Sequence, residues 1–427
     1  ILNMYFNRPE ETYLGLFGST LGCILQNISL KDFNLTGASA IGGLAGTSYN
    51  DTVLNCYAEG KIEGYSRLGL LMYFFDGYSI ENCHVKGNII GTGGGYIGGM
   101  SGLCEAQFVR NCTADVNITS TGGDAGGLFC QITRLELIEN CFVNCIINTS
   151  DDWAGGLFVF NVQVNENTIV KNCFVTGTIE SIGNNIGGLI GMIALIETSP
   201  EYVSISNCYS TVDVTGNDYV AGFVAEYAGA ITDSTIIENC YSTGQVTGNS
   251  NVGGFIGSID SLNTAFVYNS YWDMEVSGVD SSAAGEGRTT AEMTLPYGAN
   301  TYIGWDFGTV WADDIYNLND GYPRLEWACG IEEDDGYVLP ETAKLYQNYP
   351  NPFNPDTNIK FTLAGSGEVK LTVYNVLGQV VDKLLEDHLQ AGMHSVMFNA
   401  DALNSGVYYY TLEVNNEKMT KKMLLTK

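Results

Sequence analysis

The sequence is poor in charged residues, and positive charge is the scarcest. Lys and Arg number 18 against 48 Asp and Glu, so the formal net charge is −30. Nucleic-acid binding is therefore not expected, because it needs many cations to displace counterions from phosphates. Three histidines, His84, His388 and His394, leave little for histidine-based catalysis or a zinc site. The longest apolar run, 68–75, falls far short of the roughly 20 residues that span a bilayer, so no membrane span is predicted.

Apolar residues and glycine are plentiful instead. Hydrophobic residues make up 45% of the chain and 52 residues are glycine, which is typical of a folded protein rather than an acidic disordered one. Up to residue 339 the chain has 10 basic and 39 acidic residues, and from residue 340 it has 8 and 9. This shift in charge predicts a domain boundary. The chain begins at Ile1 without a Met or a signal peptide, so we expect a mature or trimmed product.

A repeat of 27 to 35 residues fills the first part of the chain. Each copy contains an Asn-Cys pair, and an eighth copy has Asn269-Ser270 instead. A Gly-Gly-Leu type turn, such as Gly126-Gly127-Leu128, keeps the same phase. The cysteines of the pairs are Cys56, Cys83, Cys112, Cys141, Cys173, Cys208 and Cys240.

Within each repeat the apolar residues alternate with period two, which indicates strands. Counting from the cysteine, positions −3 and +6 are β-branched throughout and position +2 is mostly small or β-branched. The asparagine before the cysteine is expected at a corner that resets the phase. A short repeat of this kind can bury its apolar face only by stacking on its neighbours. The sequence therefore predicts a right-handed parallel β-helix of about nine coils, and helical repeats and propeller blades do not fit the period.

The motif [IV]-x-N-C-[YF]-x-x-G-x-[IV], with its Gly-Gly-Leu turn, resembles the GLUG repeat of bacterial surface proteins. The resemblance covers roughly residues 1–330, with the coils in 1–275 and a closing segment in 276–330. The stretches 269–273, 304–307 and 321–325 look like the closing segment of that family. We expect it to cover the open end of the core with Trp272, Trp305, Trp311 and Trp327.

The repeated cysteines are expected to lie side by side inside the coils, where a thiol behaves as a small apolar group. Buried free thiols are favoured, while a few disulfides and metal ligation stay open as alternatives. Five more cysteines lie outside the repeat position: Cys23, Cys104, Cys130, Cys145 and Cys329. The repeated asparagines predict a stacked amide ladder at a corner, because Asn tolerates the left-handed conformation.

An acidic linker, 331–344, follows the repeats and contains Glu332-Glu333-Asp334-Asp335. Four carboxylates could hold calcium, but such a run is more typical of a solvated hinge, and no other cofactor is predicted. Beyond it, alternating segments at 357–363, 369–373, 379–385, 393–399, 407–414 and 418–425 predict a small Ig-like β-sandwich in 345–427.

Four motifs in this last part, at 347–355, 373–379, 405–408 and 421–425, occur in the order found in the C-terminal sorting domain of type IX secretion substrates. The resemblance covers about residues 340–427. It implies that this part engages the type IX secretion machinery and that the protein is exported to the outer surface of a Gram-negative bacterium. Cleavage of the domain and lipid anchoring of the passenger commonly follow in that family.

The repeats carry no recognised catalytic motif, such as a nucleophile elbow, a P-loop or a zinc motif. Parallel β-helices also host polysaccharide lyases and inverting glycosidases, so such an enzyme is kept as the alternative. An inverting glycosidase needs two carboxyl groups about 6.5–9.5 Å apart. No pair of outward acids on adjacent coils stands out in the sequence, and we predict no catalytic residue and no metal ligand.

Position +1 is aromatic in most copies and predicts an exposed stripe on one face. Such a stripe typically marks a partner surface for an extracellular glycan or protein, unless the flanking turns cover it. We therefore predict a non-catalytic adhesive or structural protein. The stripe comprises Tyr57, Phe142, Phe174, Tyr209, Tyr241 and Tyr271, called the aromatic row below.

The first residues, 1–6, are mostly apolar and show no obvious cap. An open coil edge is a template for another chain, and head-to-tail contacts can propagate as filaments. End-to-end stacking of copies is therefore a further expectation. It predicts that charged substitutions at Leu2 and Met4 reduce any self-association seen by light scattering.

Overall fold

The structure of the 427-residue chain is a computed structural model, and its chain divides into two compact units, Ile1–Gly336 and Tyr337–Lys427. The boundary lies within the predicted acidic linker. Cys329, Glu332, Glu333, Asp334 and Asp335 lie outside the described residues, as does part of the 347–355 motif. The structure describes residues 1–162, 167–194, 202–228, 234–260, 264–315, 317–328, 343–346, 348, 351–363, 367–389, 392–414 and 417–427.

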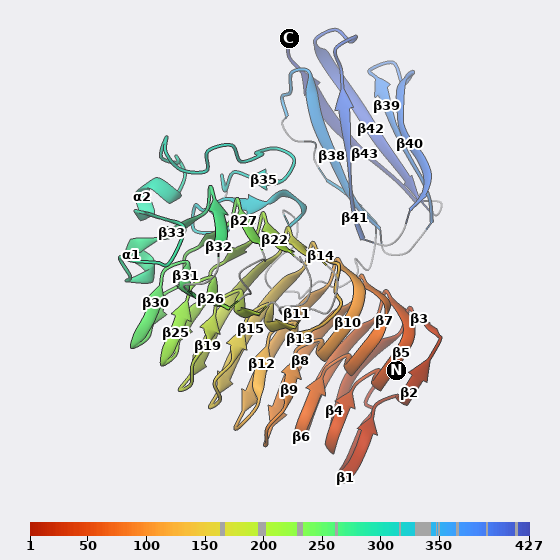
Figure 1. The fold of residues 1–427 in the computed structure, drawn as a ribbon. Helices are drawn as coiled ribbons and strands as arrows, with labels where there is room; N and C mark the ends of the chain where they lie inside the picture. The colour runs from red at the N-terminus through yellow and green to blue at the C-terminus, as the bar shows by residue number, and fades with distance from the viewer. Residues whose placement is uncertain are drawn as a thin grey trace. The chain divides into compact units, whose positions relative to one another are not determined.

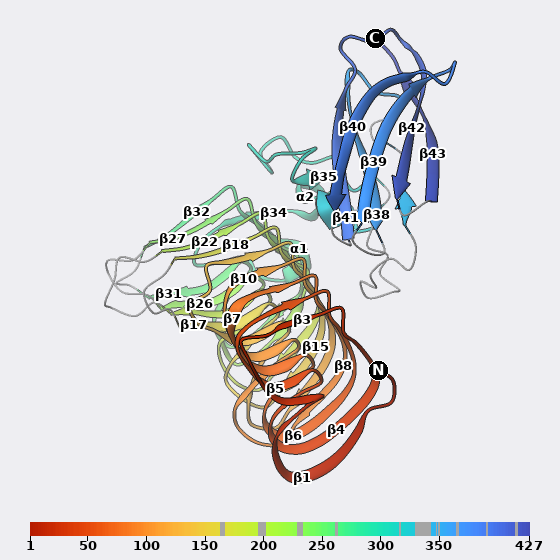
Figure 2. The ribbon, with the colours of Figure 1, turned by 90° about the vertical axis from the view of Figure 1, so that its right-hand side faces the viewer.

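The first unit is a parallel β-solenoid built from a 19-stranded and a 15-stranded sheet (Figures 1 and 2). The larger sheet contains β1 (Tyr5–Leu14), β4 (Ser29–Gly42), β6 (Tyr57–Gly69), β8 (His84–Gly91), β9 (Tyr96–Gly98), β11 (Thr113–Ser120), β12 (Asp124–Gly126), β15 (Phe142–Thr149), β16 (Ala154–Gly155), β19 (Phe174–Ser181), β20 (Ile186–Gly187), β23 (Tyr209–Ser210), β24 (Asp213–Thr215), β25 (Asp218–Ala221), β28 (Tyr241–Ser242), β29 (Val246–Thr247), β30 (Ser250–Gly253), β33 (Tyr271–Asp273) and β34 (Glu286–Arg288). The smaller sheet contains β2 (Phe17–Leu21), β3 (Ile24–Gln26), β5 (Ala45–Leu54), β7 (Met72–Glu81), β10 (Ser101–Arg110), β13 (Phe129–Ile132), β14 (Leu137–Glu139), β17 (Phe158–Val162), β18 (Thr168–Lys171), β21 (Ile190–Ala194), β22 (Tyr202–Ser206), β26 (Val224–Ala228), β27 (Ser234–Glu238), β31 (Ile256–Ile259) and β32 (Thr264–Tyr268). The predicted solenoid is confirmed.

Neighbouring coils pair at the same repeat position, so equivalent side chains stack. Phe142 of β15, for example, pairs with Thr113 of β11 on one side and with Phe174 of β19 on the other. Nine asparagines at the corner of the repeat adopt positive φ, and the solenoid has about eight turns, in agreement with the prediction of about nine coils. They are Asn27, Asn55, Asn82, Asn111, Asn140, Asn172, Asn207, Asn239 and Asn269.

The corner asparagines form the expected amide ladder. From Asn55 to Asn207, each Nδ2 donates to the Oδ1 of the preceding corner asparagine at 3.0 to 3.3 Å. Asn tolerates the left-handed conformation better than other side-chain-bearing residues, which explains its recurrence at this corner.

The interior of the solenoid is the stacked apolar core that the repeat predicts. Residues at positions −3, +2 and +6 are buried in almost every coil. Val276 at position +6 of the last copy is an exception, because helix α1 (Met274–Ser277) replaces the strand there and leaves Val276 42% exposed. The turns also depend on glycine, since a Cβ on Gly127 would lie 2.1 Å from the Gly156 carbonyl oxygen of the next coil.

The seven repeated cysteines lie in this core as buried free thiols. Each Sγ donates to the carbonyl oxygen two residues before it, at 3.2 to 3.4 Å. Ser270 occupies the same position in the last coil, where its Oγ donates to the Tyr268 carbonyl at 2.9 Å. Cys104, Cys130 and Cys145 are also buried, and burial raises the pKa of Cys104 and Cys145 to about 12. Cys23 is exposed.

Replacing Cys173 tests how tightly this row is packed. Cys173→Ser should be mild, because Ser270 already makes the required hydrogen bond at the equivalent position. Cys173→Leu should lower the free energy of unfolding by about 1–3 kcal/mol, since the added methylenes press on two neighbouring coils. Chemical denaturation of both variants, with and without reductant, measures this. Equal losses for Ser and Leu would contradict it, and a large effect of reductant on the wild type would show that disulfides form.

The closing segment follows the last coil and contains little regular structure. It comprises α1, the short strand β34 on the edge of the larger sheet, α2 (Thr290–Met293), the antiparallel pair β35 (Trp311–Ala312) and β36 (Arg324–Leu325), and a short 3-10 helix, Glu326–Ala328. Two buried carboxylates organise it. Asp273 accepts hydrogen bonds from the Glu275 and Val276 amides at the start of α1, and Asp314 accepts three from backbone amides of its own loop.

The second unit consists of two antiparallel sheets around a common apolar core, as predicted for residues 345–427. The six predicted strands are all present, and Lys344–Leu345 adds a short seventh. One sheet contains β37 (Lys344–Leu345), β38 (Asp356–Leu363) and β41 (Gly392–Asn399). The other contains β40 (Val380–Leu389), β39 (Gly367–Asn375), β42 (Gly406–Val414) and β43 (Glu417–Leu425).

In the first coil Leu2, Leu21 and Ile24 are each about two-thirds exposed, at 66, 70 and 67%. End-to-end stacking at this edge stays a prediction. No helix in the described part of the chain is both long and apolar enough to cross a bilayer.

Candidate functional site

Four rings of the aromatic row stack on one another along the larger sheet, from Phe142 to Tyr241. Ring centroids are 4.4 Å apart for Phe142 and Phe174, 4.7 Å for Phe174 and Tyr209, and 4.8 Å for Tyr209 and Tyr241. These separations match the spacing of strands in a sheet. The predicted exposure is wrong for four of the six residues, however, because Phe174, Tyr209, Tyr241 and Tyr271 are at most 7% exposed.

The closing segment covers this part of the aromatic row. Trp305 and Trp311 pack on Tyr241, with centroids 6.2 and 5.9 Å away, and Trp327 packs on Phe174 at 5.8 Å. Burial of these rings stabilises the fold, because it removes their apolar area from water. The buried rings are therefore structural and cannot bind a ligand in this state.

Hydrogen bonds fix the closing segment along the aromatic row. Trp305 donates through Nε1 to the Asn269 carbonyl, and Trp327 donates to the Asn172 carbonyl, each at 2.9 Å. The Tyr241 hydroxyl donates to the Pro323 carbonyl at 2.7 Å. Of the four tryptophans expected to cover the end of the core, Trp272 alone packs with the core residues, and the other three lie on the aromatic row.

Toward the N-terminus the aromatic row is interrupted by two residues that are neither Tyr nor Phe. Tyr57 and Phe142 are half-buried, and between them stand His84 and Thr113, which are both buried. His84 Nδ1 lies 2.9 Å from Thr113 Oγ1. Burial lowers the pKa of His84 from 6.5 to about 3, so the imidazole is neutral in the folded protein at neutral pH.

Acid should destabilise the solenoid through His84. Below about pH 6.5 the unfolded chain protonates this histidine while the folded chain does not, so stability falls by about 1.4 kcal/mol per pH unit until about pH 3. The control variant is His84→Thr, because Thr113 occupies the same position in the next coil. Between about pH 6.5 and pH 5, wild type should lose about 2 kcal/mol more unfolding free energy than His84→Thr in urea denaturation. Equal losses would contradict a buried neutral His84.

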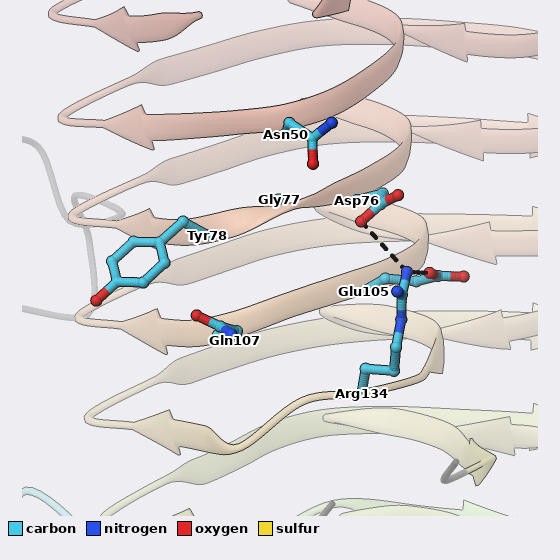
Figure 3. Close-up of a pocket in the computed structure, with 7 residues that line it drawn as sticks. All are labelled: Asn50, Asp76, Gly77, Tyr78, Glu105, Gln107 and Arg134. Atoms are coloured by element: carbon cyan, nitrogen blue, oxygen red, sulfur yellow. Dashed lines mark hydrogen bonds and ion pairs between the residues drawn. The ribbon is translucent and has the colours of Figure 1, made fainter. Parts of the chain in front are cut away.

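A polar pocket lies on the smaller sheet, away from the aromatic row. It has a volume of about 300 Å3 and is lined by Asn50, Asp76, Gly77, Tyr78, Glu105, Gln107 and Arg134 (Figure 3). These residues come from β5, β7, β10 and the turn after β13, so four successive coils contribute. The pocket is the candidate functional site of the described residues.

Asp76 and Glu105 pair in register on adjacent strands, and both contact Nη2 of Arg134. The distance from Arg134 Nη2 to Asp76 Oδ1 is 3.2 Å. No such pair of outward acids stood out in the sequence, and the structure now identifies one on adjacent coils. On the other side of Gly77 lies Tyr78, whose side chain is 57% exposed. Its ring makes an edge contact with Phe108 at a centroid distance of 5.3 Å.

A second group of acids lies in turns of the larger sheet. Burial, together with the nearby carboxylates of Asp151 and Asp152, raises the pKa of Asp124 to about 7. Asp152 Oδ1 accepts hydrogen bonds from the Asn184 backbone and side chain at 3.2 and 3.0 Å. No group of three or more His, Cys, Asp or Glu suited to a metal ion occurs within the described ranges.

Comparisons with known proteins agree with the two-part organisation. Residues 347–426 match the family model described as secretion system C-terminal sorting domain, and residues 37–63 match the GLUG motif. The chain thus carries a type IX sorting domain, which directs export to the outer surface or the extracellular space of a Gram-negative bacterium. The GLUG match covers one coil of the repeat region in which the resemblance was expected.

One curated protein, the immunoglobulin A1 protease of Streptococcus sanguinis, is 30% identical to this chain over 97 residues. The match covers 21% of this chain, and the chain spans 5% of the length of that protein. No solved structure matches the chain.

Proposed function

We propose that the protein is a secreted, surface-associated, non-catalytic β-helix that binds an extracellular glycan or protein, or builds a surface layer. The observation that carries this proposal is the linkage of a regular solenoid to a type IX sorting domain. Export through this domain places the long outward faces of the sheets where they can meet partners outside the cell. The machinery of type IX secretion is then the partner of residues 340–427.

The chemistry of the pocket supports binding rather than catalysis. One guanidinium, that of Arg134, contacts both Asp76 and Glu105. This shared contact engages both carboxylates, so they act together as positioned hydrogen-bond acceptors rather than as a separate acid and base.

The alternative is a polysaccharide lyase or inverting glycosidase, for which the Asp76–Glu105 pair would supply the carboxylates. Both carboxylates contact the same Arg134 nitrogen, so they lie closer together than the roughly 6.5–9.5 Å of an inverting glycosidase. The binding protein leaves the polysaccharide intact, whereas the enzyme cleaves it. The full chain is applied to a glycan array and, separately, incubated with the polysaccharides it binds while new sugar ends are measured. We expect binding without turnover. Release of sugar ends that Glu105→Gln abolishes would overturn the non-catalytic proposal.

A further inference from the structure

The pocket beside Tyr78 has the geometry of a sugar-binding subsite. Figure 3 shows a bare floor at Gly77, with the Tyr78 ring on one side and the Asp76, Glu105 and Arg134 side chains on the other. We propose that this pocket binds one uncharged pyranose unit of an extracellular glycan. The inference rests on the proposed function and assigns its ligand class and location.

Gly77 contributes only backbone to the floor of the pocket, because a side chain there would point into the core. A Cβ there would lie 2.4 Å from the Asp51 carbonyl oxygen and 2.6 Å from the Phe75 ring, so glycine is required by packing on the inner side. The backbone is irregular here, since the pairing of β5 with β7 shifts register on both sides of Asp51. The register skips Asn50 of β5 and Tyr78 of β7, and both residues line the pocket.

The wall made by Tyr78 offers an exposed aromatic face. The Tyr78 hydroxyl can both donate and accept a hydrogen bond. The ring presents a flat apolar surface that can pack against the C–H face of a pyranose. An edge contact with Phe108, at a centroid distance of 5.3 Å, packs against the Tyr78 ring. Gln107, from the neighbouring coil, adds an amide to the same wall.

The opposite wall supplies the polar groups that a sugar hydroxyl needs. Carboxylate oxygens accept and the guanidinium donates, so adjacent hydroxyls can engage Asp76, Glu105 and Arg134 together. Sites for small polar ligands combine aromatic area with a few such convergent groups. Asn50 on the preceding coil can add a further amide contact.

Charge selects an uncharged ligand. Two carboxylates and one guanidinium leave the pocket with one negative charge, in a chain whose net charge is −30. An anionic sugar would be repelled by both the pocket and the field of the whole protein. A cationic ligand would compete with Arg134, which already contacts both acids.

The test uses the full chain on an array of neutral, sialylated, uronic and sulfated glycans, followed by titration of the best neutral oligosaccharide. Wild type and Tyr78→Phe should bind it with similar affinity. Tyr78→Ala should weaken binding by about tenfold or more, the factor that corresponds to 1.4 kcal/mol. Tyr65→Ala is the matched control, because Tyr65 is 63% exposed but belongs to β6 in the other sheet.

Unchanged binding by Tyr78→Ala, or a preference for anionic glycans, would overturn the assignment of this pocket. If no glycan binds, the inference fails, while adhesion of the same protein to a purified surface protein would leave the proposed function standing. If glycan binding survives in Tyr78→Ala, the proposed function also stands, with its site elsewhere.

Discussion

Trp311→Ala is expected to detach the closing segment from the solenoid. Trp311 is fully buried and contacts Trp305, Tyr209 and Tyr241 at centroid distances of 4.3, 6.1 and 5.9 Å. Removing a large buried aromatic side chain costs about 3–5 kcal/mol, since transfer free energy is lost and a cavity remains. A segment with so little regular structure of its own depends on these contacts to stay ordered.

Limited proteolysis and denaturant titration followed by tryptophan fluorescence measure this effect. We expect cleavage within 276–328 in Trp311→Ala, and increased binding of a hydrophobic dye as the aromatic row is uncovered. Trp153→Ala is the control, because Trp153 lies outside the closing segment and packs on Phe160, so its loss should leave the protease resistance of that segment unchanged. Equal protease resistance in the two variants would show that the closing segment is held by something other than these rings.

The coils could be predicted from the sequence because each copy of the repeat corresponds to one coil. Position within the repeat fixes which strand a residue joins and which neighbour it stacks on, as for the corner asparagines and for Cys173. A nearly constant spacing leaves little freedom in register, and burial of one face then fixes the direction of each side chain.

The location of the closing segment could not be predicted in the same way. It has no repeat, and its contacts join residues far apart in sequence, such as Trp327 and Asn172, which are 155 positions apart. In the sequence, a row of six aromatics on one face and tryptophans in and near the closing segment are compatible with a partner surface as well as with coverage of the row by the chain itself. The packing of the closing segment on the aromatic row decides between these two alternatives, and the period of the repeat does not.

The pocket was missed for a related reason. Asp76 and Glu105 are 29 residues apart and occupy the same position of the repeat. Aligning the repeats over their full length would therefore have shown that two acids stack on adjacent coils. Tyr78 and Arg134 could not have been placed, since register shifts near Asp51 and positive φ at Arg134 break the alternation of faces. Extrapolating period two through such irregularities assigns side chains to the wrong face.

Deleting residues 340–427 is expected to abolish surface display. The passenger folds as a separate compact unit, so its solenoid should still form, but the chain would lack the domain that matches the sorting family. The full chain with Cys173→Ser is a suitable control, because that change leaves the sorting domain intact and is expected to be mild.

The most direct test of this account is antibody labelling of intact cells that express the full chain or the 340–427 deletion in a bacterium with the type IX machinery. The account predicts strong surface labelling for the full chain and for Cys173→Ser. For the deletion it predicts labelling near background, with the protein recovered from inside the cells. Equal surface labelling of the deleted chain would contradict export through the C-terminal domain.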